Sequence, residues 1–169
     1  AVLGALVAKA QLSVATLHHE GNVTIYSGSQ IQTAIDNAVA GDTIYLSEGV
    51  FDGFSVAKDI AIIGSGVTTT VSGGVTLGAS TSLLLSNMYM MSTVETGTKR
   101  ENSPSNLKIV QCFFAYNLGI NYCGSAEIAQ SVVKGSLLCG GDYSATNDAV
   151  VVAYNSKLRY TNVSYSSLS

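Results

Sequence analysis

The chain has 169 residues, which is enough for one domain with a hydrophobic core. Charged residues make up 11% and hydrophobic residues 47%, with 17 Gly and 1 Pro, and this composition excludes an intrinsically disordered chain. The formal net charge is −3, and the sequence has no cluster of Lys and Arg that could bind phosphates. We therefore expect no nucleic-acid partner.

The first residues are apolar and end in small side chains. Ala1 to Ala8 is a short apolar run, and the sequence AKA at 8–10 has small residues at the two positions that a signal peptidase reads. We therefore expect residues 1–10 to be the remnant of a secretory signal peptide and the mature protein, from Gln11, to be secreted or on the cell surface. The alternative is a short capping helix that belongs to the fold. No stretch reaches the ~18 apolar residues of a membrane span, so we expect none.

Three cysteines, Cys112, Cys123 and Cys139, lie in the second half of the chain. In an exported protein one pair could form a disulfide and leave an odd thiol, and the alternative is that all three are buried small hydrophobic residues. The sequence leaves this open. It contains no C-x-x-C pair, and its only histidines are the neighbours His18 and His19, so we expect no zinc site.

The sequence predicts one amphipathic helix, over residues 29–40. Its apolar residues recur at i, i+3, i+4 and i+7, namely at Ile31, Ala34, Ile35 and Ala38. Ser29 is the expected N-cap, and Gly41 is the expected C-terminal stop.

Short strands are predicted after this helix, separated by Gly, Ser, Asn and Asp. Their sequences are DTIYL, DIAII, TTTV, GVTL, SLLLS, NLKIV, EIAQSVV, AVVVAY and KLRYT. Many short strands without long helices indicate an all-β fold, which is a sandwich, a barrel or a solenoid.

A recurring amide decides among these folds. An alternating strand is followed by an amide at Asn87, Gln111, Gln130 and Asn162, which is a repeat of about twenty residues with an inserted loop before the last. A repeat of that length fits one coil of a parallel β-helix, in which buried amides at one corner can hydrogen-bond their neighbours in a ladder. We therefore expect residues 11–169 to form a single parallel β-helix domain with such a structural ladder.

The two ends of such a solenoid need cover, because an open end exposes apolar core and unpaired strand edges. The apolar face of the helix at 29–40 is suited to cap the N-terminal end. The C-terminal sequence KLRYTNVSYSSLS reads as another coil with no cap after it. We therefore expect that the native chain continues there or that this end contacts another chain or a downstream domain.

The segment IQTAIDNAVAGDTIYLSEGVFDG, with IAIIGSG after it, resembles the N-terminal part of pectin-lyase-like right-handed parallel β-helix proteins. The matching positions are Ile31, Gln32, Ala34, Ile35, Ala38, Gly41, Asp42, Thr43, Ile44, Leu46, Gly49, Ile60, Ile62 and Gly64. The resemblance implies an all-β, right-handed, single-stranded parallel β-helix with an N-terminal capping α-helix. It does not imply one function, because the superfamily includes polysaccharide lyases and hydrolases, adhesins and phage tail proteins.

Catalytic signatures of that superfamily are missing. The N-T-D, D-D and R-I-K patterns of its hydrolases and the R-x-P-x-x-R stretch of its lyases do not occur. The candidate catalytic residues are Asp142 and Asp148, which flank an inserted loop, and Lys108 and Arg159, which alternate with apolar neighbours. The two aspartates could hold calcium through oxygen ligands or could be turn residues. No other metal or cofactor is expected.

The two basic residues, Lys108 and Arg159, should point outward because their neighbours in each strand are apolar. Aligned on one face they could meet an acidic sugar; otherwise they are solvated surface charges. Late in the chain the candidate binding residues are tyrosines, whose rings could stack on sugars or could simply pack in strands. These are Tyr116, Tyr122, Tyr143 and Tyr160.

The sequence therefore predicts an exported, non-catalytic β-helix that acts as a surface, adhesive or carbohydrate-contacting module, with polysaccharide as the candidate partner. One alternative is a polysaccharide lyase or glycoside hydrolase of this fold, or a fragment of one. The other is a purely structural segment of a larger exported protein. An acid and a base converging from adjacent coils would indicate an enzyme, whereas a row of exposed aromatic side chains would indicate a binding module.

Overall fold

The structure is a computed structural model that describes residues 12–96, 105–121, 123–140, 149–164 and 166–168. The predicted signal-peptide remnant at 1–10 lies outside these residues. Within the described ranges, no helix has both the length and the apolar character needed to cross a membrane.

The described chain forms many short strands, one 3-10 turn and one short α-helix. In chain order they are β1 Val14–His19, β2 Asn22–Ser27, η1 Gly28–Gln30, α1 Ile31–Asn37, β3 Thr43–Leu46, β4 Gly49–Phe51, β5 Phe54–Val56, β6 Ile60–Ile63, β7 Thr69–Val71, β8 Val75–Leu77, β9 Ser82–Ser86, β10 Tyr89–Met90, β11 Val94–Thr96, β12 Ser105–Val110, β13 Phe113–Phe114, β14 Leu118–Asn121, β15 Cys123–Ala129, β16 Val132–Gly140, β17 Ala149–Tyr154, β18 Lys157–Ser164 and β19 Ser166–Leu168.

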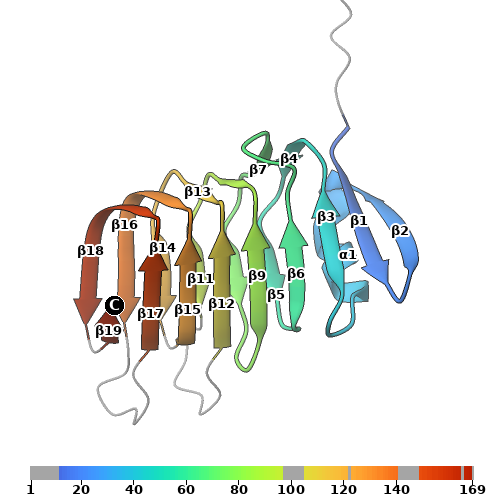
Figure 1. The fold of residues 1–169 in the computed structure, drawn as a ribbon. Helices are drawn as coiled ribbons and strands as arrows, with labels where there is room; N and C mark the ends of the chain where they lie inside the picture. Colours follow the sequence, from blue (N-terminus) through green and yellow to red (C-terminus); the bar gives the residue numbers. More distant parts are fainter. Residues whose placement is uncertain (1–11, 97–104, 122, 141–148, 165, 169) are drawn as a thin grey trace, which may run out of the picture.

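The strands stack into a parallel β-solenoid, as Figure 1 shows from the side. A nine-stranded sheet has the order β19-β17-β15-β12-β9-β6-β3-β1-β2, and a ten-stranded sheet has the order β4-β7-β10-β13-β16-β14-β11-β8-β5 with β18 beside β16. Each early coil gives one strand to the first sheet and two to the second; for example, β6, β7 and β8 follow β3, β4 and β5 with parallel pairing throughout. The predicted all-β parallel solenoid with a helix near its N-terminal end is confirmed.

The cross-section of the coils changes along the solenoid. Strand β16 pairs with β13 through Val132 and Val133 and with β14 through the segment from Leu137 to Gly140, so one strand spans two faces that are separate in earlier coils. Before this strand, Gln130 and Ser131 lie between the end of β15 and the start of β16 and belong to neither strand. The prediction of one continuous strand EIAQSVV is therefore wrong, because this segment turns a corner of the coil.

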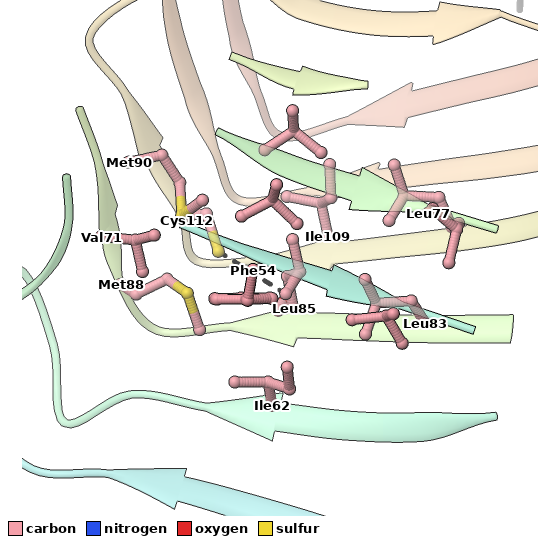
Figure 2. Close-up of a cluster of buried hydrophobic side chains, with 14 of the residues drawn as sticks. Phe54, Ile62, Val71, Leu77, Leu83, Leu85, Met88, Met90, Ile109 and Cys112 are labelled. Atoms are coloured by element: carbon pink, nitrogen blue, oxygen red, sulfur yellow. Dashed lines mark hydrogen bonds between the residues drawn. The ribbon is translucent and has the colours of Figure 1, made fainter. Parts of the chain in front are cut away.

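The hydrophobic core lies inside the coils and is built of stacked aliphatic side chains. The register places equivalent inward residues of successive coils above one another, as in the column Ile44, Ile62, Leu85, Ile109 and Ile128. Figure 2 shows Leu85 and Ile109 facing Phe54 from the other wall of the solenoid, with Met88 and Met90 beside them. In strands such as β12, buried and exposed residues alternate, so every second side chain points into the core.

The three cysteines, Cys112, Cys123 and Cys139, are all free and buried. Burial raises the pKa of the Cys112 thiol to about 11, and this thiol donates a hydrogen bond to the Leu85 carbonyl oxygen at 3.6 Å, drawn as a dashed line in Figure 2. The cysteines therefore act as small core residues.

The capping helix is shorter than its predicted range of 29–40. It runs over Ile31–Asn37 after the 3-10 turn, and Gln30 rather than Ser29 is its N-cap. It ends before Gly41 because Ala38 is already extended and because Lys58 Nζ binds the last carbonyl groups, including that of Ala38 at 2.7 Å. Its predicted apolar face is confirmed as buried, at Ile31, Ala34, Ile35 and Ala38.

A hairpin of β1 and β2 also covers the N-terminal end, and the sequence did not predict it. Strand β1 pairs antiparallel with β3, the first strand of the solenoid, and β2 pairs antiparallel with β1. The strand edge of the first coil is therefore covered by the hairpin, while the helix covers its core.

The hairpin is attached to the solenoid by a histidine–carboxylate contact. His19 Nδ1 lies 2.7 Å from Asp42 Oδ1, and Asp42 Oδ2 accepts the Val39 N–H at 2.9 Å. The hydrogen bond that the His19 ring donates to Asp42 raises the pKa of His19, and the charge of Glu20 adds to this rise. Burial opposes ionisation of Asp42, but the Val39 N–H and His19, together with the charge of Lys58, outweigh it and lower the pKa of this carboxyl.

These two shifts predict a pH window for hairpin attachment. The His19 contribution is complete below its ordinary pKa of 6.5 and is lost as pH rises through its raised pKa. The Asp42 contribution is complete above its ordinary pKa of 3.8 and is lost as pH falls through its lowered pKa. We expect the melting temperature to fall as pH rises from 6 to 8, and we expect His19→Gln to flatten this fall. His18→Gln is the matched control, because His18 contacts the Tyr45 ring at 4.8 Å instead; equal flattening by both variants would contradict this assignment.

The amides predicted to form a buried ladder have a different role. Asn87, Gln111 and Gln130 do share a corner, directly after β9, β12 and β15, but Gln111 and Gln130 are exposed. Asn162 lies inside β18, and the residue that follows the next strand, β17, is Asn155. The prediction of a buried side-chain ladder that includes Asn162 is therefore wrong.

The residues at this corner share a left-handed backbone conformation, which suits the two asparagines among them. Asn87, Gln111, Gln130 and Asn155 have φ of 63°, 55°, 50° and 49°, a left-handed conformation that few side chains other than Asn adopt readily. In that conformation the Asn87 N–H donates to the Val110 carbonyl of the next coil at 3.0 Å, and the Gln111 N–H donates to Ala129 at 3.0 Å. The stacking at this corner is thus made by main-chain groups.

Candidate functional site

A groove of about 610 Å³ lies on the outer face of the nine-stranded sheet. Its lining comes from successive coils, from the residue before β6 to the end of β17. The lining residues are Asp59, Ile60, Ser82, Leu83, Leu84, Asn106, Leu107, Lys108, Ser125, Ala126, Glu127, Val150, Val152 and Tyr154.

The groove combines an apolar floor with ionisable groups. The outward residues Val150 and Val152 are 45% and 38% exposed, and Leu84 is half-buried. Leu84, Lys108, Glu127 and Val152 are register partners from one coil to the next. They therefore form one row that crosses the strands, with apolar side chains at both ends and charged ones in the middle.

A second row, of small polar side chains, runs parallel to the first. Ser82 N–H donates to Asp59 Oδ1 at 2.7 Å, Asn106 Nδ2 donates to Ser82 Oγ at 3.4 Å, and Ser125 Oγ donates to Asn106 Oδ1 at 2.7 Å. Ser82, Asn106 and Ser125 are register partners, so these bonds connect neighbouring coils. The result is a continuous line of hydroxyl and amide groups along one side of the groove.

Three side chains meet at the other side of the groove. Lys108 Nζ lies 2.9 Å from Glu127 Oε2, and the Tyr154 hydroxyl donates a hydrogen bond to Glu127 Oε1. Each residue belongs to a different coil, since they lie on β12, β15 and β17. Glu127 is thus held between a cation and a phenol.

The electrostatics of this cluster keep each group in its ordinary charge state. The hydrogen bond from Tyr154, followed by that from Lys108, lowers the pKa of Glu127. The hydrogen bond to Glu127 raises the pKa of Lys108, and the same carboxylate raises the pKa of Tyr154. A general base or acid at neutral pH needs a shift in the opposite direction, as when burial raises a carboxyl pKa or lowers that of a lysine.

The predicted catalytic candidates are dispersed. Lys108 points outward into the groove, as predicted, and Arg159 is also exposed. Arg159 lies on β18, which pairs with β16 of the ten-stranded sheet, so of the two alternatives for these basic residues, alignment with Lys108 on one face does not hold. Asp142 and Asp148, with the proposed calcium site, lie outside the described residues. Within the part of the chain that the structure describes, no group of His, Cys, Asp and Glu could hold a metal ion.

Only one predicted binding tyrosine has a described side chain. Tyr116 is 57% exposed and lies between β13 and β14, away from the groove lining. Tyr122 and Tyr143 lie outside the described residues, and Tyr160 is described only as part of β18. The tyrosine that lines the groove is Tyr154. The sequence could have predicted this, because alternation in AVVVAY puts Tyr154 on the same face as Val150 and Val152.

A short aromatic row occurs on the ten-stranded sheet. The Tyr89 and Phe113 rings, which are register partners on β10 and β13, stack with centroids 5.1 Å apart, and Lys134 Nζ lies 5.2 Å from the Phe113 centroid. Because Tyr89 and Lys134 both pack on Phe113, this row stabilises neighbouring coils more than it offers a free ring face.

Comparison with known proteins found no protein-family model, no curated protein and no solved structure that matches the chain. The groove itself is therefore the basis for a functional proposal.

Proposed function

We propose that the protein is an exported, non-catalytic β-solenoid that contacts carbohydrate through the groove on its nine-stranded sheet. We further propose that it belongs to the pectin-lyase-like superfamily, on the resemblance of residues 31–64. The observation that carries the functional proposal is that one groove holds apolar side chains, such as Leu84 and Val152, beside a parallel row of hydroxyl and amide groups.

The two rows match the two kinds of surface on a sugar. A pyranose ring has an apolar face of C–H groups, which packs on side chains such as Leu84 and Val152, and an edge of hydroxyls, which bonds to groups such as Asn106 and Ser125. Neighbouring strands are ~4.8 Å apart, close to the length of one sugar unit, so the polar row can meet hydroxyls of successive units. A linear polysaccharide crossing the strands would therefore meet a hydroxyl or amide group at each of the three coils that carry Ser82, Asn106 and Ser125.

Charge favours an uncharged glycan over a polyuronate. The groove lining contains one cation, Lys108, and two carboxylates, Asp59 and Glu127. The Lys108 charge is already paired with Glu127 at 2.9 Å, so a uronate would have to displace that carboxylate.

The pKa shifts support binding without turnover, because Lys108 stays protonated and Glu127 stays ionised at neutral pH. The second candidate function is a polysaccharide lyase or hydrolase. One observation favours it: Lys108 and Glu127 converge from adjacent coils, which is the arrangement expected of an enzyme of this fold.

The test is a panel of neutral and acidic polysaccharides, with binding measured by affinity electrophoresis and turnover by release of reducing or unsaturated ends. We expect binding of a neutral glycan without product, and we expect Asn106→Ala to weaken it at least about fivefold, the cost of about one hydrogen bond. The control is Thr76→Ala, since Thr76 makes an exposed 2.7 Å hydrogen bond to Ser55 on the ten-stranded sheet. Product release that Glu127→Gln abolishes would establish an enzyme instead, and absence of binding to the whole panel would refute carbohydrate contact.

A further inference from the structure

Strand β2 is an uncovered edge of the nine-stranded sheet. It is the last strand in the sheet order, and in the described part of the chain nothing pairs with its outer side. In Figure 1 it lies at the outer end of the row of strands, beyond β1. Its register with β1 is continuous from Asn22 to Ser27, so no bulge distorts this edge.

The side chains of β2 do not protect this edge. The sequence NVTIYS contains no charged residue and no proline, the two devices by which proteins usually block an edge strand. Val23 and Ile25 are 53% and 70% exposed, and their register partners are His18 and Thr16. They therefore belong to the outer face of the sheet, beside Tyr45, which is 44% exposed.

We propose that β2 pairs antiparallel with β2 of a second copy of this chain, forming a two-fold symmetric dimer with one continuous sheet. In an antiparallel pair, directly opposite residues lie on the same face. A two-fold axis perpendicular to the sheet at Thr24 places Val23 opposite Ile25 of the second copy, and Ile25 opposite Val23. Both exposed apolar residues then gain an apolar cross-strand partner, which stabilises such pairs.

Charge makes a second copy an acceptable partner even though the chain carries a net charge of −3. The charge next to β2 is Glu20, in the hairpin turn. In this register the two Glu20 residues lie at opposite ends of the paired strands, about 27 Å apart at ~3.4 Å per residue. That separation is well beyond the Debye length of ~8 Å at physiological ionic strength, so the repulsion is screened.

The geometry also has a consequence for the groove. An axis perpendicular to the sheet leaves the outer faces of both copies pointing to the same side, so the dimer presents two grooves together. This consequence rests on the proposed function, under which a long polysaccharide could engage both grooves and gain avidity. The dimer itself does not depend on it.

Sedimentation velocity of the full chain over about 1 to 500 µM tests the proposal, because a contact of one short strand is small and should dissociate in the micromolar range or above. We expect a reversible monomer–dimer equilibrium. Because the interface is isologous, Ile25→Lys changes it at two places and should raise the dissociation constant at least about tenfold. Val67→Lys is the matched control, since Val67 is also 70% exposed but lies outside the strands.

A monomer at every concentration would overturn the proposal, and so would equal weakening by Ile25→Lys and Val67→Lys. Amide hydrogen exchange gives a second readout, in which protection that grows with protein concentration should be confined to residues 22–27. Concentration-dependent protection of β19 at the other end of the sheet, with none in β2, would also refute it. Circular dichroism of both variants checks that they are folded, as expected of substitutions at exposed positions.

Discussion

Leu85→Ala is expected to lower the free energy of unfolding by about 3–5 kcal/mol, at the upper end of what truncating one core side chain costs. Leu85 is fully buried, and it stacks between Ile62 and Ile109 of the neighbouring coils. Figure 2 shows it in the centre of the interior, facing Phe54. Its truncation leaves a cavity that stacked strands on both sides cannot close, because their spacing is fixed by main-chain hydrogen bonds.

The neighbouring residue gives a control of the same chemistry. Leu84 lies on the same strand, but it points outward into the groove and is only half-buried. We expect Leu84→Ala to cost no more than about 1.5 kcal/mol, because most of the lost side chain faces water or can be covered by relaxation. Urea unfolding followed by circular dichroism measures both values. Equal destabilisation by the two variants would contradict the inward and outward assignment of β9.

Gly73→Ala is expected to destabilise the protein by about 2–3 kcal/mol, because it forces two backbone segments apart. Gly73 lies at the corner between β7 and β8, directly above Gly53 at the corner between β4 and β5. A Cβ on Gly73 would lie 2.7 Å from Gly53 Cα and closer still to Gly53 N. These are main-chain atoms that neighbouring hydrogen bonds hold in place, including Ser72 N–H to Phe51 O at 2.9 Å.

The adjacent Gly74→Ala should have the opposite sign. A Cβ there would meet only Thr93 O at 3.8 Å, an ordinary contact, and Gly74 is not among the glycines with positive φ. Alanine restricts the unfolded chain more than glycine, so we expect Gly74→Ala to be neutral or to stabilise by up to about 1 kcal/mol. Thermal unfolding of the two variants side by side checks this. A destabilised Gly74→Ala with an unchanged Gly73→Ala would show that the corners do not stack as described.

The groove shows why function was harder to predict than fold. Lys108 and Glu127 are 19 residues apart, and Glu127 and Tyr154 are 27 apart. Coils of unequal length bring them together, and the alternation within each strand shows only that each side chain points outward. The sequence repeat, read with an inserted loop before its last amide, assigned Asn162 to the corner, whereas the structure has Asn155 there, directly after β17.

The same limit applies to the hairpin. Nothing in the alternation of residues 14–27 distinguishes a cap on the solenoid from a hairpin elsewhere. The hairpin is attached by the antiparallel pairing of β1 with β3 and by the hydrogen bond between His19 and Asp42. His19 and Asp42 are 23 positions apart in the chain.

The sequence by itself determined the class of fold, because hydrophobic periodicity is local. Alternation within each strand defines an inner and an outer face, and the spacing of Ile31, Ala34 and Ile35 defines the buried side of the helix. Tertiary structure decided the register between coils. Only that register aligns the polar row from Ser82 to Ser125 and places Lys108 beside Glu127, because each of these contacts joins residues whose spacing in the chain is set by corners of variable length.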